Sequence, residues 1–176
     1  MSEQEMPYGP SARFFEDFRL GDRIVTQGRT VTPADGLFWA MFTGDMNPMH
    51  VDEEFASRHG IFGGKFPPGL MSVAIASGLK ERLGLTAGTA LAMLEQTIRY
   101  KSPVLFGDTI HVVLIVNEVE PHPTKPRGTV RFHYEVVKHG GEVASEGEWV
   151  MVFAARRQSP AASPAPARRL PKKKSP

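Results

Sequence analysis

Apolar residues at helical spacing predict a first helix over residues 33–43. Its expected buried stripe consists of Leu37, Phe38, Met41 and Phe42. Thr32 precedes this segment and is of a type that caps helix N-termini, while Pro33 and Asp35 occupy the first and third helical positions. We therefore expect a well-started helix that packs its apolar stripe into the core.

Two more helices are predicted on either side of a loop rich in glycine and proline. The Asn47-Pro48 step repeats the start signal and predicts a helix over residues 48–58. The loop at residues 59–69 holds four glycines and two prolines, so we expect it to present backbone groups rather than side chains. Residues 70–83 are apolar nearly all round before Gly84, which predicts a helix enclosed by other structure.

Segments rich in β-branched and aromatic residues predict a sheet around these helices. A short strand is expected near residues 23–32. Four more follow the last helix, at residues 90–100, 109–120, 128–138 and 142–155. Gly140-Gly141 predicts a hairpin between the last two. This order of elements indicates an α+β fold in which an antiparallel sheet wraps over the 70–83 helix.

Composition limits the chain to one domain and shows an uneven charge. The chain has 176 residues, of which 41% are hydrophobic, enough for one core and too few for two. Residues 156–176 hold seven of the 21 basic residues and none of the 19 acidic ones, so residues 1–155 carry a formal charge of −5. We expect a domain over residues 12–155 and a disordered, basic Pro/Ala-rich tail over 156–176. An acidic domain argues against nucleic-acid binding, except by attraction of polyanions to the tail.

The same composition bears on location and on redox chemistry. No segment approaches the roughly 18 apolar residues of a membrane span, and the first residues lack the pattern of a signal peptide. The absence of cysteine excludes disulfides, thiolate metal sites and cysteine nucleophiles. We expect a soluble cytoplasmic protein.

Asp45 and His50 flank the Asn47-Pro48 step in the stretch FTGDMNPMHVD. A side chain just before a helix and another in its first turn can point at one water or one substrate atom. Such a pair can take a proton and return one, which is general acid–base catalysis. These residues alone leave a structural alternative open, in which Asp45 interacts with the helix N-terminus and His50 is a partly buried histidine.

Four blocks of the sequence together resemble the MaoC-like dehydratases, the family of the (R)-specific enoyl-CoA hydratases. In chain order they are FEDFRLGDRI, TGDMNPMHVDEEFA, FGGKFPPGLMSVAIASGL and YKSPVLFGDTI. The second block resembles the family motif S/T-G-D-x-N-P-x-H-x-D. The resemblance covers about residues 13–153 and implies a hotdog fold, in which an antiparallel sheet wraps a long central helix. It also implies a homodimer with active sites near the subunit interface.

The activity that this resemblance implies is the reversible addition of water to a trans-2-enoyl-CoA, giving an (R)-3-hydroxyacyl-CoA. Asp45 and His50 match the catalytic residues that bind the water, and we expect Asp45 to act on the water and His50 to donate the proton. The acyl-CoA is the substrate, so no cofactor is expected. The acyl chain itself is not specified by the sequence.

The resemblance further implies substrate-binding roles for Gly69, Ser77 and Asn47. Gly69 matches a glycine whose backbone N–H stabilises the thioester oxygen at the start of the central helix. Ser77 matches a serine near the acyl pocket, although it can equally be a small residue that lets the sheet approach the helix. Many relatives have histidine where this chain has Pro68, which bears on pocket shape and substrate choice.

Other residues are weaker candidates. Four methionines fit either an acyl channel or core packing, and core packing is the simpler interpretation: Met41, Met46, Met49 and Met71. Three basic residues fit either coenzyme A phosphates or solvated surface charges: Lys65, Arg99 and Lys101. The remaining histidines show no metal-ligand spacing, so we expect no metal site: His59, His111, His122, His133 and His139.

Two alternative functions stay open. A hotdog acyl-CoA thioesterase shares the fold and ligand class but usually has a lone carboxylate and no N-P-x-H block. A non-catalytic acyl-thioester-binding subunit would keep its biological activity when Asp45 and His50 are replaced.

Overall fold

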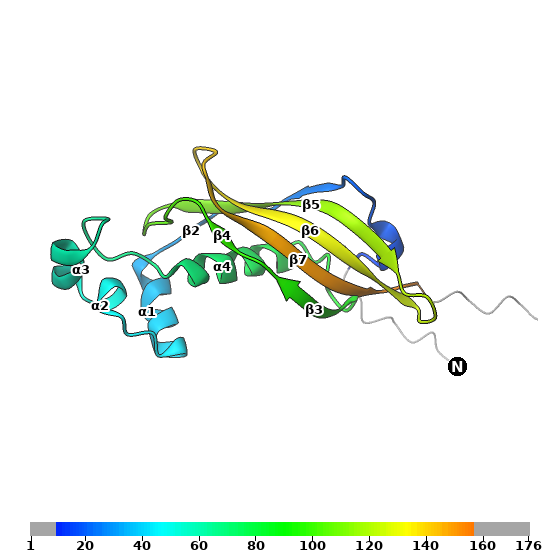
Figure 1. The fold of residues 1–176 in the computed structure, drawn as a ribbon, viewed down its shortest axis with the longest axis horizontal. Coiled ribbons are helices and arrows are strands. Elements are labelled where there is room, and N and C mark those ends of the chain that lie inside the picture. The colour runs from blue at the N-terminus through cyan, green and yellow to red at the C-terminus, as the bar shows by residue number, and fades with distance from the viewer. Residues whose placement is uncertain (1–9, 157–176) are drawn as a thin grey trace, which may run out of the picture.

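The computed structural model describes residues 10–156, in which three short helices lie at one end of a longer helix that is covered by a sheet (Figure 1). The helices are η1 (Phe15–Asp17, a 3-10 turn), α1 (Pro33–Thr43), α2 (Pro48–Val51), α3 (Glu53–His59) and α4 (Gly69–Glu81). The strands are β1 (Arg23–Val25), β2 (Arg29–Thr30), β3 (Ala90–Gln96), β4 (Arg99–Tyr100), β5 (Thr109–Pro121), β6 (Arg127–Lys138) and β7 (Val143–Ala154).

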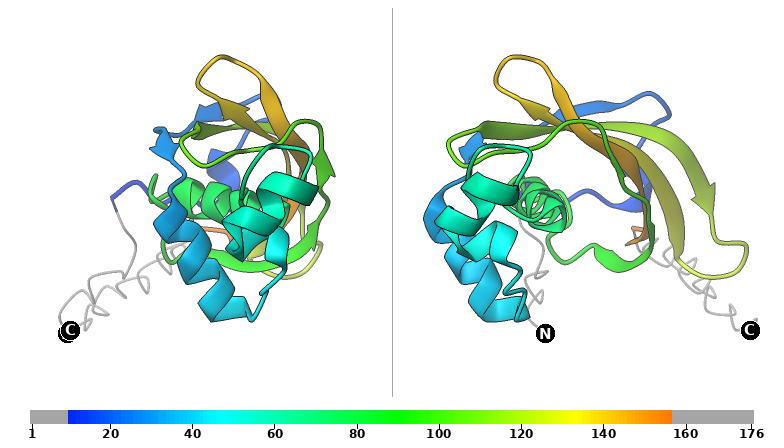
Figure 2. Two further views of the ribbon diagram at one scale, coloured as in Figure 1. Left: turned by 90° about the vertical axis from the view of Figure 1, so that its left-hand side faces the viewer. Right: turned by 60° about the vertical axis from the view of Figure 1, so that its left-hand side comes forward.

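The seven strands form one antiparallel sheet that curves over α4 (Figure 2). Its order is β1-β5-β6-β7-β3, with β2 paired to β5 and β4 paired to β7. The inward residues of α4 are buried in the same core as the inner face of the sheet: Met71, Val73, Ala76 and Leu79. The expected α+β fold, a sheet wrapped around a central helix, is therefore confirmed.

Strand β6 illustrates how the two faces of the sheet are divided. Buried and partly exposed residues alternate along it. Val130, Phe132 and Tyr134 face α4 and the core, whereas Arg131 and His133 lie between them on the outer face. A period of two is what a strand with one buried face requires. The outer face of β6 is thus polar and open to solvent.

Two predicted strands are each divided by a threonine whose side chain takes over a ladder hydrogen bond. The expected strand 23–32 splits into β1 and β2 because the hydroxyl of Thr26 accepts the Val112 N–H at 2.9 Å. The expected strand 90–100 splits into β3 and β4 at Thr97, whose hydroxyl accepts the Glu148 N–H at 2.9 Å. Gly147 lies opposite, where a Cβ would fall only 2.0 Å from the Thr97 carbonyl oxygen.

The helix predicted over residues 48–58 is also divided, into α2 and α3. Asp52 has extended backbone angles, φ −112° and ψ 108°, and is at once the last cap of α2 and the first cap of α3. Its carboxylate accepts the Phe55 N–H at 2.9 Å. Aspartate competes with helix continuation in this way because its short side chain bonds to nearby backbone.

The apolar stripe of α1 was expected to be buried, and this prediction is wrong for the single chain. The four side chains are 64–78% exposed: Leu37, Phe38, Met41 and Phe42. Helix α1 instead packs inward the face that carries small residues. Ala40 on this face is 2% exposed, and Gly36 lets the ring of Phe106 approach. The helical periodicity identified which residues form the apolar stripe, but it did not show whether the rest of the same chain buries them.

The remaining helix and turn predictions agree closely with the structure. Helix α4 begins one residue before the predicted range and ends two residues before its end. Gly141, with φ 87°, forms the hairpin between β6 and β7 as predicted. Within residues 10–156, no helix has the length and apolarity needed to cross a bilayer. The predicted tail lies outside the described residues except for Arg156, which pairs with Asp17 at 2.6 Å.

Candidate active site

The helices α1, α2 and α3 form a cap, here called the helical cap, beside the N-terminal end of α4 (Figures 1 and 2). Asp45 lies in the connection between α1 and α2, directly after Gly44, whose left-handed φ of 76° ends α1. Its backbone N–H donates to the Thr43 hydroxyl at 3.2 Å, and its carboxylate accepts the Asn47 N–H at 3.4 Å. These bonds fix the half-buried Asp45 in the connection between α1 and α2.

Asn47 starts the single turn of α2, as its position before Pro48 predicts. Its side-chain oxygen accepts the Met49 N–H at 3.1 Å, which satisfies one of the free donors at the helix start. Asp52 ends the same turn through its backbone N–H, which donates to the Pro48 carbonyl oxygen at 3.0 Å. His50 lies between the two caps.

His50 is anchored through its ring to the loop that leads into α4. Its Nδ1 lies 2.8 Å from the carbonyl oxygen of Phe66, and its ring meets the Phe66 ring edge-on at 5.0 Å between centroids. A carbonyl can only accept, so Nδ1 carries the proton and Nε2 of the neutral imidazole carries the lone pair. The loop thus offers a backbone carbonyl to His50, as its composition predicts. The expectation that its side chains stay out of the site is wrong, because Phe62, Phe66 and Pro67 line the adjoining pocket.

The start of α4 offers backbone donors without a side-chain cap. Pro68 occupies the N-cap position and makes no side-chain cap bond. Gly69 is the first helical residue, so its N–H has no acceptor within the helix. The ring of Tyr100 packs against Gly69 so closely that a Cβ there would lie 2.9 Å from it. Glycine is therefore required by this contact.

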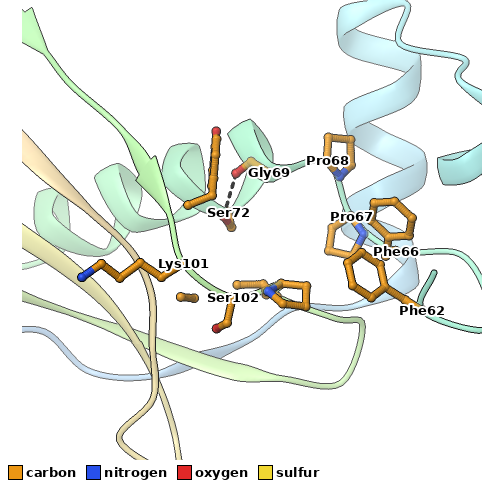
Figure 3. A pocket seen from close by; sticks show the side chains of 12 residues that line it. Phe62, Phe66, Pro67, Pro68, Gly69, Ser72, Lys101 and Ser102 are labelled. Carbon is orange, nitrogen blue, oxygen red and sulfur yellow. Dashed lines mark hydrogen bonds between the residues drawn. The ribbon is translucent and has the colours of Figure 1, made fainter. Parts of the chain in front are cut away.

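A mostly apolar pocket of about 280 Å³ opens at this helix start (Figure 3). The rings of Phe62, Phe66 and Pro67 face Ser102 across it. Gly69 and Tyr100 also line it, and burial raises the pKa of the Tyr100 hydroxyl. The Ser72 hydroxyl donates to the Gly69 carbonyl at 2.7 Å, so it is engaged with the helix. Rings and backbone, rather than charged groups, make up most of this wall.

The structure brings some of the predicted site residues together and separates others. His50 bonds to Phe66, which lines the pocket together with Pro68 and Gly69. Asp45, Asn47 and His50 themselves do not line it. No hydrogen bond or ion pair joins Asp45 to His50 among the described residues. Ser77 lies eight residues beyond Gly69, about 12 Å along α4 at the usual helical rise. It does not line this pocket.

The structure also separates the weaker candidates, namely the basic residues and the methionines. Lys101 lines the pocket but its Nζ pairs with Glu146 at 2.8 Å. Met71 is buried in the core, as expected, whereas Met41 and Met46 are 72% and 57% exposed, so core packing is wrong for these two.

Sequence reasoning missed the side chains that shape the pocket and the acceptor that orients His50. Phe66 acts through its carbonyl, a group that every residue carries and that leaves no signal in a sequence. Tyr100 stands at the start of the block YKSPVLFGDTI, but only the fold shows that this block packs against Gly69.

Comparison with known proteins identifies the type of domain. The sequence profile of the family described as MaoC like domain matches residues 17–138. A 3-hydroxybutyryl-CoA dehydratase of Methylorubrum extorquens is 31% identical over 65% of this chain and 70% of the relative. An (R)-specific enoyl-CoA hydratase of Rhodospirillum rubrum is 29% identical over 81% of this chain and 93% of the relative.

A solved structure identifies the fold by name. A Mycobacterium tuberculosis protein described as having a double hotdog fold superposes with a TM-score of 0.72 at 17% identity, covering 90% of this chain and 53% of that protein. At this identity the likeness concerns the fold alone, and it agrees with the expected hotdog arrangement.

Proposed function

This chain belongs to the MaoC-like domain family, and from this premise we propose that it catalyses the reversible hydration of a trans-2-enoyl-CoA to an (R)-3-hydroxyacyl-CoA. Relatives named as a dehydratase and a hydratase support the hydro-lyase class. The observation that carries the proposal is the bond from His50 Nδ1 to the Phe66 carbonyl. It ties the histidine of the D-x-N-P-x-H motif to a residue three positions before Gly69.

In the proposed reaction, a water lies between the Asp45 carboxylate and Nε2 of His50. Nε2 takes a proton from the water as its oxygen bonds to C3, and the π electrons shift towards C2 and the thioester oxygen. The imidazolium then returns the proton to C2, so one water is added and no proton is gained or lost. The Asp45 carboxylate accepts a hydrogen bond from the other O–H of the water and so orients it, and that hydrogen stays on the oxygen as the 3-hydroxyl forms. The Nδ1 bond favours this division over the one expected from the sequence, where His50 only donates.

The negative charge on the thioester oxygen is stabilised, in this proposal, by the N–H of Gly69. A backbone donor fixed at a helix start needs no reorganisation when the charge develops, and the helix dipole has the favourable sign. Pro68 keeps this donor available because its ring cannot cap the helix. Asn47 and Ser77 remain proposed substrate-binding residues: the Asn47 amide can donate from Nδ2, and Ser77 lies further along α4.

A homodimer acting in the cytoplasm is part of the proposal. The exposed stripe of α1 borders an open groove of about 550 Å³ between α1 and α4, whose lining includes Phe38, Phe42 and Ile75. Strand β3 is at the edge of the sheet and exposes Leu91 and Leu94. Large exposed apolar surfaces are typical of association sites. A second copy of this chain, which carries the same exposed surfaces, is the partner in this proposal.

The test is a hydration assay on a panel of trans-2-enoyl-CoA esters, following loss of the enoyl-thioester absorbance. We expect Asp45→Asn and His50→Gln each to lower kcat/KM by about 100-fold or more, the usual contribution of acid–base catalysis. His59→Gln on α3 is the matched control and should keep the rate. Chiral analysis of the product should give the (R)-alcohol.

Three outcomes would contradict the proposal. Release of free thiol without hydration would indicate the thioesterase alternative. Full activity of either variant would exclude the proposed roles, and binding of acyl-CoA without turnover across the panel would indicate a non-catalytic subunit.

A further inference from the structure

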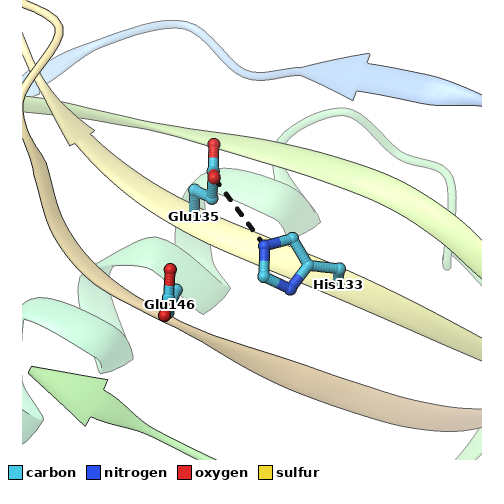
Figure 4. Close-up of side chains that lie close together, drawn as sticks. All are labelled: His133, Glu135 and Glu146. Atoms are coloured by element: carbon cyan, nitrogen blue, oxygen red, sulfur yellow. Dashed lines mark ion pairs between the residues drawn. The ribbon is translucent and has the colours of Figure 1, made fainter.

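Three potential metal ligands gather on the outer face of the sheet (Figure 4). His133 and Glu135 are two residues apart on β6, so they point to the same face. Glu146 on β7 is directly opposite Glu135 in the strand register. One ligand atom from each side chain lies within 4.8 Å of the others.

The two carboxylates of this cluster are balanced unequally by their neighbours. Two carboxylates directly opposite each other on neighbouring strands destabilise a sheet unless something offsets their repulsion. Glu146 pairs with Lys101 at 2.8 Å, and Arg99, directly opposite it on β4, adds a second positive charge nearby. Within the described part of the chain, Glu135 pairs with the His133 ring, at 3.7 Å between Oε1 and Nε2, and an imidazole offsets a carboxylate charge only when it is protonated. Nearby Arg131 is already shared among Glu95, Glu118 and Glu148.

We propose that His133, Glu135 and Glu146 bind a divalent transition-metal ion of the Zn²⁺ type. One imidazole nitrogen and two carboxylate oxygens form a donor set suited to zinc, and a histidine ligand disfavours Mg²⁺ and Ca²⁺. Ligand distances of about 2.0–2.2 Å are reached by rotating the two glutamate side chains inward, since their backbones are fixed by the strand pairing. His133 and Glu146 also line a hollow of about 270 Å³, which leaves room for a water as the fourth ligand.

The three proposed ligands do not line the candidate active-site pocket, but Lys101 does, and it competes with the metal for Glu146. The ammonium group of Lys101 neutralises Glu146, and its presence lowers the pKa of that carboxyl most strongly. Removing this amine should therefore free an oxygen for the metal. Sequence spacing could not reveal the cluster, because Glu146 reaches it only through the pairing of β6 with β7.

The test is isothermal titration of the tag-free full chain, stripped with a chelator, with ZnCl₂. We expect one equivalent of Zn²⁺ per chain, and His133→Ala, Glu135→Gln and Glu146→Gln should each weaken binding by about tenfold or more. His111→Ala on β5 is the matched control and should bind as the wild type does. Lys101→Met should bind at least as tightly as the wild type.

No zinc uptake by the wild type, or wild-type affinity in His133→Ala or Glu135→Gln, would overturn the proposal. Displacement of Zn²⁺ by an equal concentration of Mg²⁺ would overturn the choice of metal class. Weaker binding by Lys101→Met would contradict the proposed competition. Far-UV circular dichroism on each variant shows whether the sheet is intact, so that loss of binding is assigned to the ligands.

Discussion

The helical cap and the wrapped core, meaning α4 with the sheet, differ in how much apolar surface they bury. In the core, Tyr134, Trp149 and Phe153 are almost completely buried, and the rings of Tyr134 and Trp149 stack at 4.4 Å. In the cap, the hydrophobic residues that are fully buried are Ala40 and Ala56. Yet the cap carries Asp45, Asn47 and His50, and the core carries none of the polar groups proposed to act on water.

The difference shows how this fold separates stability from chemistry. Apolar burial supplies most of the favourable free energy of folding, and here it is concentrated between the sheet and α4. The cap is instead held by short-range polar bonds, such as those of Asn47 and Asp52, and by the His50 contact with Phe66. Functional groups often lie on segments that a rigid scaffold positions, and the cap is such a segment.

The test with the largest expected effect replaces one tryptophan in each region by alanine. Trp149 is fully buried, stacks on Tyr134 and lies beneath the Lys80 ammonium, so Trp149→Ala should lower the free energy of unfolding by about 3–5 kcal/mol. Trp39 on α1 is only half-buried, and Trp39→Ala should cost clearly less. Urea denaturation measures both. Equal losses would show that the cap is packed as tightly as the core.

A second test concerns the exposed stripe of the cap. Phe38 and Phe42 stack on each other at 6.1 Å and are largely exposed. If a second copy covers them, Phe38→Ser/Phe42→Ser should weaken the dimer at least about tenfold in sedimentation experiments, since aromatic anchors dominate interfaces. Leu20→Ser, at an equally exposed leucine outside the cap, is the control. A dimer of undiminished affinity would place the interface elsewhere.

The smallest expected effect concerns Asp35, in the first turn of α1, where the helical cap begins. Burial alone would raise the pKa of Asp35, but hydrogen bonds from Thr32 and the Arg29 charge bring it below its ordinary value. The folded state therefore favours the ionised carboxylate. This stability is present above the unfolded pKa of about 3.9 and is lost as the pH falls through the lower folded value.

Asp35→Asn should accordingly cost about 1 kcal/mol at pH 7, and the gap between variant and wild type should close below about pH 4. Urea titrations at several pH values measure this gap. Glu54→Gln, which removes an exposed charge of α3 that pairs with Arg58, should cost less than about 0.5 kcal/mol. A gap that persisted at low pH would show that the Asp35 contribution is not carried by its charge.

Local signals in the sequence predicted the elements whose ends are decided locally. Thr32 and Pro33 start α1, Asn47 caps α2, and Gly141 makes the last hairpin, because each acts on residues next to it. The divisions of the strands could not be predicted in this way. Thr26 replaces a ladder bond with Val112, and Thr97 does so with Glu148, partners that are distant in the chain.

The sequence singled out candidate residues for the site but not the contacts that orient them. The motif around Asp45 and His50 named the polar groups, and the glycine-rich loop predicted a backbone contribution. The tautomer of His50 depends on one carbonyl, and the need for Gly69 depends on the Tyr100 ring. The exposed stripe of α1 was mispredicted for a similar reason. The periodicity of the sequence shows which face of a helix is apolar, but not whether that face packs against the same chain.

The bond from His50 to the Phe66 carbonyl has a consequence for how tolerant the pocket is to change. Because the acceptor is a main-chain oxygen, no side-chain replacement at position 66 removes it, and Pro67 restricts Phe66 to extended conformations that keep the chain path. A change of the Phe66 ring alters its edge-on contact with His50 but leaves in place the acceptor that sets the tautomer. Substrate range and proton transfer can therefore diverge independently in this chain, one through side chains and the other through the backbone.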